Sequence, residues 1–360
     1  MRLEAVAMRS LVLLFVLCCG GLAAQTIKQP TFFARRDYPG AGGTVAVADV
    51  NGDGIPDVIT SGGPYLSILL GNGNGTFTPG LTTMPAGPEL GLLVPVDLNG
   101  DGIIDLVIDG GGSGIGVMFG NGDATFQPPI YYYAGHDTFC GGGLVVADFT
   151  SDGFPDAVLS CNSGIWFFTG LGGGVFSPGV LTPVDPTGAT ENATLVASDF
   201  NGDGNLDLAV GYYVYGGRSG FGLLPGNGDG TFQAPVVYDA PSFPRWMAVG
   251  DLNGDGLSDL LLGWPGTGGA IFLNNGKGGF GEPIAITMPS EGGAIGDLNG
   301  DHIADIVTSD GNVYFGLGNA QFAPPVYYPV ADGVGPTNVV FADCQRKMIM
   351  SYLRKVEMSG

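Results

Sequence analysis

Charged residues, and basic ones above all, are scarce in this chain of 360 residues. They make up 13% of the sequence, and 12 lysines and arginines stand against 34 aspartates and glutamates. Phosphate backbones are bound by basic patches, so this balance argues against a nucleic-acid partner. Glycine, with 67 residues, is by contrast very abundant. This composition favours many short strands joined by tight turns over long surface helices.

Catalytic motifs are also missing. Histidine occurs twice, at His136 and His302, and the sequence contains no G-x-S-x-G, no H-E-x-x-H and no phosphate-binding loop. The glycine-rich stretches recur at the turns of a repeat, so they do not indicate a phosphate cradle. The sequence therefore predicts no catalytic residue, and we expect no catalytic role for His302.

Long hydrophobic runs are absent except near the N-terminus. The run Leu11–Cys19 follows two basic residues, Arg2 and Arg9, and precedes small residues that end at Ala24. It is shorter than the roughly 20 apolar residues that span a bilayer. This pattern predicts a signal peptide over residues 1–24 and a secreted, cell-surface or periplasmic protein with no transmembrane segment in the mature chain. A lipoprotein signal is the weaker alternative, because poor residues precede the cysteine.

Cysteine is rare. Cys18 and Cys19 lie in the predicted signal peptide, which leaves Cys140, Cys161 and Cys344. An exported protein can form disulfides, and Cys140 and Cys161 flank one repeat, so they either pair or remain as thiols. Cys344 would then have no partner.

An aspartate-rich motif occurs six times, four times as D-x-N-G-D-G-x-x-D, once with Thr150 and Ser151 in place of N-G and once with His302 in place of the second glycine. Its first aspartates are Asp49, Asp97, Asp148, Asp199, Asp251 and Asp297, which are 46 to 52 residues apart. A nearly constant period in this range indicates a repeat architecture.

Each repeat has the same order of segments. Short apolar runs precede and follow the aspartate motif, and a third run leads to a Gly/Asn turn that ends in phenylalanine, as in Gly71–Phe77 and Gly226–Phe232. A fourth, often proline-containing stretch leads to the next repeat. Runs of four to six apolar residues bounded by Gly, Asn and Pro are typical of strands. Four strands per repeat predict the blade of a β-propeller.

The two ends of the repeat region complement each other. Thr31–Gly43 is similar to Thr231–Ser242, so it is a fourth strand without the three that should precede it. Thr337–Asp343 is similar to a first strand without its successors. Beyond it the motif fails, because Lys347 and Ser351 stand where aspartates belong. This indicates either a truncated closing blade or a divergent terminal repeat.

We therefore expect an all-β fold, a β-propeller of the seven-bladed type with six complete four-stranded blades and a composite, truncated closing blade. The predicted domains are the signal peptide, the propeller over residues 25–343 and a divergent tail over residues 344–360.

The aspartate motif has the chemistry of a cation site. Counting Asp49 as position 1, Asn51, Asp53 and Asp57 follow at positions 3, 5 and 9, and Gly54 at position 6 permits a sharp turn. An all-oxygen donor set suits calcium better than magnesium, which prefers water ligands and strict octahedral geometry. An EF-hand is excluded, because its last acidic ligand is at position 12 and helices flank its loop, whereas here the last aspartate is at position 9 and strands flank the loop. The alternative is a set of Asx-rich turns without metal.

These four positions in six loops are the predicted calcium ligands, for about six sites. They are Asp49, Asn51, Asp53, Asp57; Asp97, Asn99, Asp101, Asp105; Asp148, Thr150, Asp152, Asp156; Asp199, Asn201, Asp203, Asp207; Asp251, Asn253, Asp255, Asp259; Asp297, Asn299, Asp301 and Asp305. Their aspartates are 18 of the 34 acids, and without them the net charge of −22 would be −4. The third loop is expected to bind more weakly through Thr150, and the sixth carries His302 at its turn.

These loops and turns resemble FG-GAP/VCBS repeats, which also form the propeller of integrin α subunits. The resemblance covers residues 31–343 and implies calcium on the loop between the first and second strands of each blade. It does not extend to Asp343, because Lys347 departs from the pattern. Members of this family include adhesion modules, lectins and accessory domains of enzymes.

Aromatic residues are the candidates for ligand contact. Tyr131–Tyr133, Trp166, Tyr212–Tyr215, Trp246 and Trp264 either stack on ligands or pack within the sheets. The best candidate is Trp246 with Arg245, on a loop that enters a first strand. We expect an adhesion or binding module for an unknown protein or carbohydrate. The alternatives are an extracellular enzyme acting on glycans or phosphodiesters, and a stabilising module that has lost its partner domains.

Overall fold

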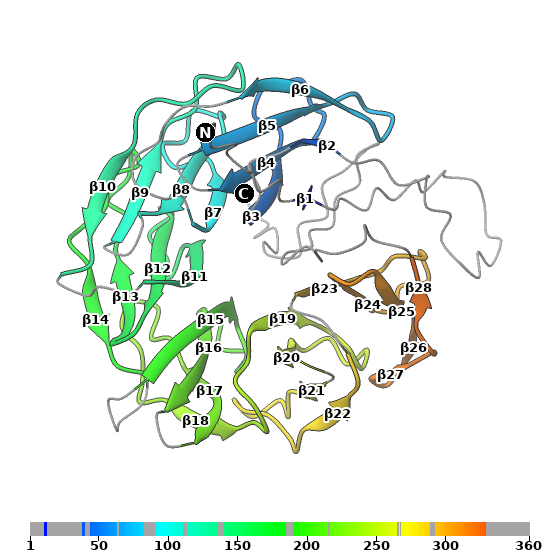
Figure 1. Ribbon diagram of the computed structural model, residues 1–360. Helices are drawn as coiled ribbons and strands as arrows, with labels where there is room; N and C mark the ends of the chain where they lie inside the picture. The colour runs from blue at the N-terminus through cyan, green and yellow to red at the C-terminus, as the bar shows by residue number, and fades with distance from the viewer. Residues whose placement is uncertain are drawn as a thin grey trace, which may run out of the picture.

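The computed structural model consists of β-strands arranged as a ring of sheets (Figure 1). No helix occurs in the part of the chain that it describes, and consequently no helix there could span a membrane. The structure describes residues 11–12, 38–39, 44–62, 65–82, 91–110, 114–135, 140–184, 190–214, 217–264, 266, 268–288 and 292–328.

Six blades surround the central axis, and each is a four-stranded antiparallel sheet whose strands pair in chain order. The first strand of each blade lies innermost (Figure 1). Blades 1 to 3 comprise β3 (Thr44–Ala48), β4 (Asp57–Gly62), β5 (Tyr65–Gly71), β6 (Phe77–Thr82); β7 (Leu93–Val96), β8 (Asp105–Asp109), β9 (Gly114–Met118), β10 (Ile130–Tyr133); β11 (Cys140–Ala147), β12 (Asp156–Cys161), β13 (Gly164–Phe168) and β14 (Val180–Thr182). Blades 4 to 6 comprise β15 (Thr190–Ser198), β16 (Asp207–Val214), β17 (Arg218–Leu224), β18 (Val236–Asp239); β19 (Trp246–Gly250), β20 (Asp259–Trp264), β21 (Gly268–Phe272), β22 (Ile284–Ile286); β23 (Gly293–Gly296), β24 (Asp305–Thr308), β25 (Asn312–Tyr314) and β28 (Val326–Tyr327). In blade 6 a small hairpin of β26 (Gly316–Gly318) and β27 (Gln321–Phe322) precedes the last strand.

The second and third strands are apolar on both faces because blades stack on both sides of them. Every residue of β8, β9 and β12 is buried. The outermost strands β10 and β18 begin and end on exposed residues and are only half-buried between. A strand that is covered on both faces reads as a continuous apolar run, as the predicted second strands do.

The hydrophobic core therefore lies between blades. Ile59 and Ile68 of blade 1 pack in one cluster with Leu106 and Ile108 of blade 2. Between blades 4 and 5, Phe221 stacks on Tyr238 with ring centroids 4.7 Å apart, and further phenylalanines meet these rings edge to face. Phe126, Phe176 and Phe280, which end Gly/Asn turns, belong to such clusters. Each blade thus buries its faces only against its neighbours.

The prediction of six four-stranded blades is confirmed, whereas most of the predicted seventh lies outside the described residues. These undescribed residues include Asp343, Lys347 and Ser351. One part is described: β2 (Tyr38–Pro39), which pairs with β1 (Leu11–Val12) inside the predicted signal peptide.

Tyr38 repeats a contact made elsewhere by a fourth strand. Its hydroxyl accepts a hydrogen bond from the Phe77 N–H of blade 1 at 3.1 Å. The hydroxyl of Tyr238, on the fourth strand of blade 4, accepts one from Phe280 N–H of blade 5, also at 3.1 Å. Tyr38 thus makes with blade 1 the contact that a fourth-strand tyrosine, Tyr238, makes with the blade that follows it, blade 5.

Cys140 and Cys161 form a disulfide, which decides the alternative that the sequence left open. The two residues face each other at the open end of β11 and β12. Cys344 lies outside the described residues.

Loss of this disulfide should destabilise the chain by about 3 kcal/mol, the chain-entropy value for a loop of this length. We expect C140A/C161A to unfold at a lower denaturant concentration than the oxidised wild type. The wild type in excess reductant should approach the variant. Coinciding unfolding curves for variant and oxidised wild type would contradict this expectation.

Candidate functional site

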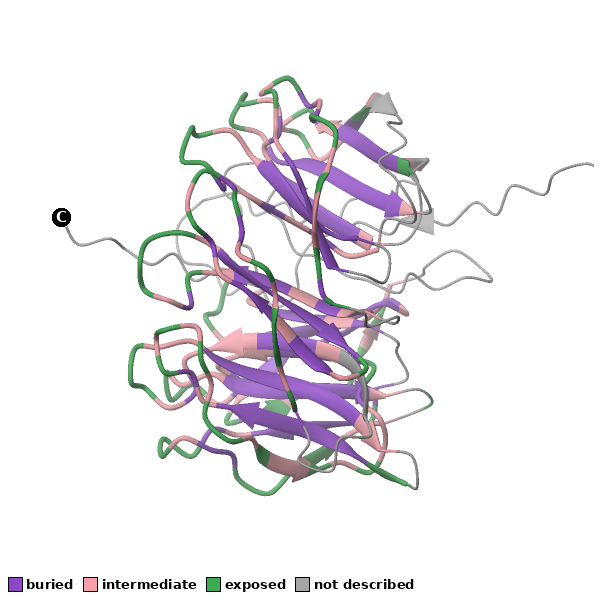
Figure 2. Cartoon of the chain, turned by 90° about the vertical axis from the view of Figure 1, so that its left-hand side faces the viewer, coloured by how far each residue is buried: buried purple, intermediate pink, exposed green. Residues whose placement is uncertain are grey.

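The six aspartate loops lie on one face of the propeller. Each joins the first and second strands of its blade, and since strands alternate in direction, the turn after the third strand lies on the same face. Figure 2 shows the exposed loops gathered along one side of the molecule. The connections between second and third strands, and between blades, lie on the opposite face.

The first loop is curled around the carboxylate at position 1. Asp49 Oδ1 accepts hydrogen bonds from the N–H groups of Gly52 (2.8 Å) and Asp53 (3.2 Å), and Oδ2 accepts one from Gly54 N–H (2.7 Å). Asn51 Oδ1 accepts from Asp53 N–H at 2.9 Å. Gly52 and Gly54 have φ of +74° and +81°, so glycine serves both bends.

The aspartate at position 9 ties the loop to the rest of the blade. Asp57 Oδ2 accepts from Val50 N–H at 3.0 Å, and Oδ1 accepts from Gly71 N–H, at the turn after the third strand, at 2.8 Å. The same pair of bonds recurs in the other five blades. Their aspartates and donors are Asp105 with Leu98 and Gly120, Asp156 with Phe149 and Gly170, Asp207 with Phe200 and Gly226, Asp259 with Leu252 and Asn274, and Asp305 with Leu298 and Gly316.

These position-9 carboxylates are almost fully buried, which raises their pKa values. The two N–H bonds act in the opposite direction, but desolvation outweighs them, and in five loops the neighbouring loop aspartates raise the pKa further. The pKa values of Asp207 and Asp305 reach about 6. Negative charge is thus concentrated where the described residues do not neutralise it.

The side chains at positions 1, 3, 5 and 9 of each loop offer only oxygen ligands, the type that a hard cation prefers. A carboxylate has about four acceptor sites. Asp49 uses three of them for N–H groups, and Asp53 uses two, for Ile55 N–H and the Asn51 amide. Oxygen lone pairs therefore remain at every acidic position. As the side chains stand, however, no three of the described Asp, Glu, His or Cys residues gather closely enough to hold a metal ion.

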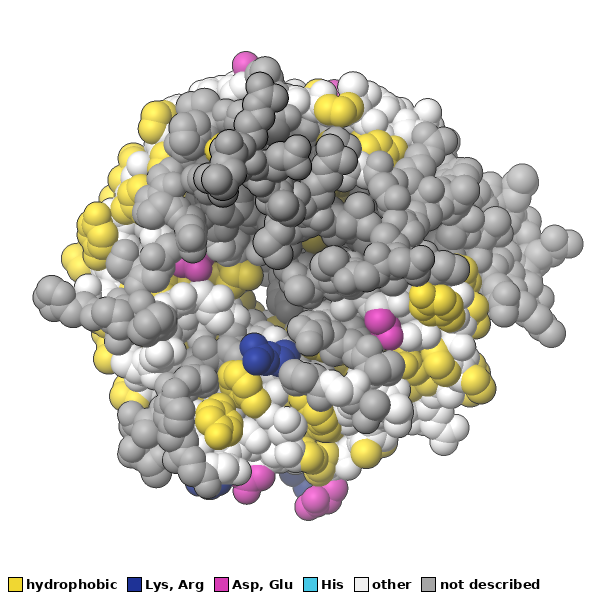
Figure 3. Space-filling model, in the orientation of Figure 1, with side chains coloured by type: hydrophobic (Ala, Val, Ile, Leu, Met, Phe, Trp, Pro, Cys, Tyr) yellow, Lys and Arg dark blue, Asp and Glu magenta, His cyan; other side chains and the backbone are white. Residues whose placement is uncertain are grey.

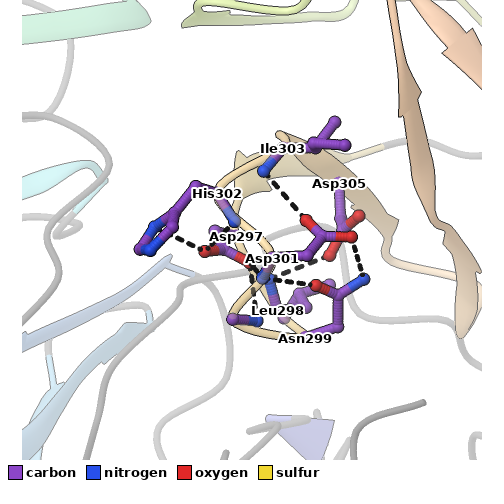
Figure 4. A network of polar contacts seen from close by, with 8 residues as sticks. Asp297, Leu298, Asn299, Asp301, His302, Ile303 and Asp305 are labelled. Atoms are coloured by element: carbon purple, nitrogen blue, oxygen red, sulfur yellow. Dashed lines mark hydrogen bonds and ion pairs between the residues drawn. The ribbon is translucent and has the colours of Figure 1, made fainter. Parts of the chain in front are cut away.

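The third and sixth loops keep this curl with different residues at the bends. Ser151 (φ +58°) and His302 (φ +67°) adopt the left-handed conformation that glycine has in the other loops. In the sixth loop, His302 N–H donates to Asp297 Oδ2 at 2.9 Å, and its Nδ1 lies 3.7 Å from the same oxygen (Figure 4). The exposed imidazole points away from the loop interior, so it takes the place of a glycine without filling the loop. His136 lies outside the described residues.

The loops are also part of the contacts between blades. Ala124 N–H, in the turn of blade 2, donates to Val50 O in the loop of blade 1 at 3.0 Å, and Ala320 N–H donates to Leu252 O at 2.9 Å. Asn274 Nδ2 donates to Phe200 O at 2.7 Å. Each of these carbonyls belongs to position 2 of a loop, so the conformation of one loop is coupled to the next blade.

The structure separates the aromatic candidates. Trp246 is buried, and a Cβ built on Gly263 or Gly293 would lie within 2.6 Å of its ring. Of the two alternatives for Trp246, packing between strands is therefore the one that the structure shows. Arg245 beside it is exposed. Tyr212 is fully buried and Trp166 and Trp264 are half-buried, whereas Tyr133 is 66% exposed. Tyr215 lies outside the described residues.

Sequence reasoning named Tyr213 among the aromatic candidates, but it missed Phe243 and did not place either residue beside Arg245. The guanidinium lies 5.6 Å from the ring centroid of Phe243, and the Phe243 ring lies 5.9 Å from that of Tyr213. The aromatic residue two positions before Arg245 was a usable signal. The approach of Tyr213, 30 residues away, had none.

Comparison with known proteins identifies the family to which the repeats are similar. The sequence model of the FG-GAP-like repeat family matches residues 49–108, 97–159, 148–210 and 251–308. No curated protein matches the chain.

Among solved structures, the chain is similar to a lectin of Agrocybe aegerita described as recognising non-reducing terminal N-acetylglucosamine. The identity is 21% over 79% of each chain, with a TM-score of 0.59. It is also similar to the BP39L lectin of Burkholderia pseudomallei, at 13% identity over 85% of this chain and 90% of that one, with a TM-score of 0.63. BBS1N in complex with ARL6DN matches at 12% identity over 89% and 88%, with a TM-score of 0.52. At these identities the likeness shows the propeller fold.

The raised pKa values predict an unusual pH dependence for the metal-free chain. Because the folded pKa of Asp207 and Asp305 is about 6 against 3.8, the folded state binds more protons between these values. In excess chelator the melting temperature should therefore rise as the pH falls from 7 to 5. D207N and D305N should each flatten the slope. A melting temperature that is constant or lower at pH 5 would contradict the burial of charged carboxylates.

Proposed function

The chain belongs to the FG-GAP-like repeat family, and from that premise we propose that it is an exported, calcium-stabilised propeller that binds a carbohydrate or protein ligand. The ligand face is the one opposite the aspartate loops. The observation that carries this proposal is the division of the two faces, one occupied by six acidic loops and the other by the connections around Arg245.

Calcium would be held by positions 1, 3, 5 and 9 of the six loops, with Thr150 in place of the asparagine in the third. When bound, it would supply positive charge to loop carboxylates that now raise the pKa of the position-9 aspartate. The loop residues do the rest: position 1 keeps the loop curled through its N–H bonds, and position 9 anchors it to the second strand. Binding to the folded chain alone would couple calcium to stability.

Export is supported by two features. The N-terminal residues have the pattern of a signal peptide, and the Cys140–Cys161 disulfide belongs to an oxidising compartment.

Seven blades are supported by Tyr38, which contacts blade 1 as a fourth strand contacts its successor. The closing blade would then draw on both ends of the chain.

A binding role is favoured over the enzyme alternative by where the perturbed acids lie. In the described part of the chain, the aspartates with raised pKa are all at position 9 of the loops, and those with lowered pKa, Asp123 and Asp229, accept hydrogen bonds in turns. An enzyme would need a cluster of such groups outside the loops. The two lectins of the same fold agree with a binding role.

The calcium proposal is tested by thermal melts with and without calcium, together with a metal count. We expect about six ions per chain and a higher melting temperature, since each site at 100 times its Kd contributes about 2.7 kcal/mol. D203N, at position 5 of the fourth loop, should lose one ion.

D229N is the matched control for D203N. Both aspartates are exposed on the same face of blade 4. Asp229 accepts from Thr231, as Asn74 accepts from Thr76 in blade 1, so asparagine is already suited to that turn. D229N should keep the full metal count. If no metal is bound and chelator leaves the melting temperature unchanged, the calcium proposal is wrong and the loops are Asx turns without metal.

The binding role is tested on a panel of immobilised glycans and extracellular proteins. We expect saturable binding to at least one of them by the calcium-loaded chain, and equal binding by D229N, because that residue lies on the loop face. Turnover of a glycan or phosphodiester by the same preparation would favour the enzyme alternative.

A further inference from the structure

The connection between blades 4 and 5 is held rigidly on the face opposite the aspartate loops. Pro244 is buried and packs against β16: a Cβ built on Gly211 would lie at ordinary van der Waals distance, 3.5 Å, from Pro244 Cβ. Arg245 N–H donates to Gly263 O at 2.8 Å. The buried Trp246 wedge follows at once. Burial on both sides of Arg245 therefore fixes its backbone while its side chain stays exposed.

This fixed connection presents a cation beside two aromatic rings. Arg245 lies over Phe243, and the Phe243 and Tyr213 rings are tilted by 56° to each other. Arg245 is exposed and the two rings are half-buried. On the face drawn in Figure 3, basic and hydrophobic side chains lie next to each other at the central opening. Exposed groups on a rigid scaffold are the usual carriers of binding function.

Arg245 also differs from the other basic residues that the structure describes, Arg218 and Lys277. Arg218 is paired with Asp239 at 3.0 Å. Lys277 lies in a Gly/Asn turn, on the face of the aspartate loops. Arg245 has no carboxylate of the described chain within 4.0 Å. In a protein with a net charge of −22, an exposed guanidinium left without an acid is suited to an anion from outside.

We propose that Tyr213, Phe243 and Arg245 form a subsite for a carboxylated sugar, such as a uronic acid. This inference rests on the proposed binding function and names its ligand class. The planar guanidinium donates two parallel hydrogen bonds to a carboxylate. The rings offer apolar surface to the C–H side of the sugar ring. A neutral sugar would use the rings alone, so charge determines the selectivity of this subsite.

The test compares tetragalacturonate with its carboxyl-reduced, neutral counterpart by titration calorimetry of the calcium-loaded chain. We expect the acidic probe to bind at least tenfold more tightly, a difference of about 1.4 kcal/mol, because only the acidic probe can accept the charge-assisted hydrogen bonds of the guanidinium. Its affinity should fall between 50 and 500 mM NaCl.

R245Q should lose at least tenfold in affinity for the acidic probe and little for the neutral one. R218Q is the matched control, an exposed arginine of the same face whose partner is Asp239, and it should bind as the wild type does. F243A should weaken both probes. All three variants alter exposed or half-buried side chains, so an unchanged melting temperature verifies their fold.

The outcomes separate this inference from the proposed function. Equal affinity of R245Q and wild type for the acidic probe, or of the wild type for both probes, overturns the subsite and leaves the binding function standing. No binding of tetragalacturonate overturns it as well, while the panel of glycans and proteins judges the binding function independently.

Discussion

The buried carboxylate at position 9 of each aspartate loop is the contact on which the rest of the propeller depends. Its two oxygens accept N–H groups from two different segments, the start of its own loop and the turn after the third strand. Both segments would otherwise hold a buried N–H without an acceptor, at a cost of roughly 1–3 kcal/mol each. One aspartate therefore fixes the first, second and third strands of a blade relative to each other. The same arrangement buries a carboxylate in each of the six blades.

The aspartate loops join the stability of a blade to that of the ring. The position-2 residue donates its N–H to the position-9 carboxylate, and in three of the loops its carbonyl accepts from the turn of the next blade. Because blades bury their faces only against neighbours, a disturbance in one loop reaches the adjacent core as well. A cation bound at positions 1, 3, 5 and 9 would relieve the repulsion among the loop aspartates. It would thereby stabilise both the strands of one blade and their packing on the next.

The two faces consequently have different tasks. Acidic side chains, glycine bends and Asx bonds occupy one face and hold the strands in order. The other face carries the connections between blades, and there Pro244 and Trp246 fix the backbone on either side of an exposed arginine. The first face holds the loops that keep the strands in order, whereas the second carries the Cys140–Cys161 disulfide and the exposed Arg245.

The sequence by itself determined the features that repeat: the period, four strands per blade, and the sharp turn of each aspartate loop at position 6, where the sixth loop has His302. The period is visible because the same motif recurs, and each strand or turn within it depends on residues within about ten positions, where alternation, glycine and Asx chemistry act locally. The tertiary structure alone decided which aromatic residues are exposed. Trp246 reads as a surface residue until Gly263 and Gly293 make room for its ring. Tyr213 meets Phe243, and Tyr38 meets Phe77, across 30 and 39 residues. Such contacts are set by how one blade packs on the next, because the register between blades has no local periodicity from which it could be read.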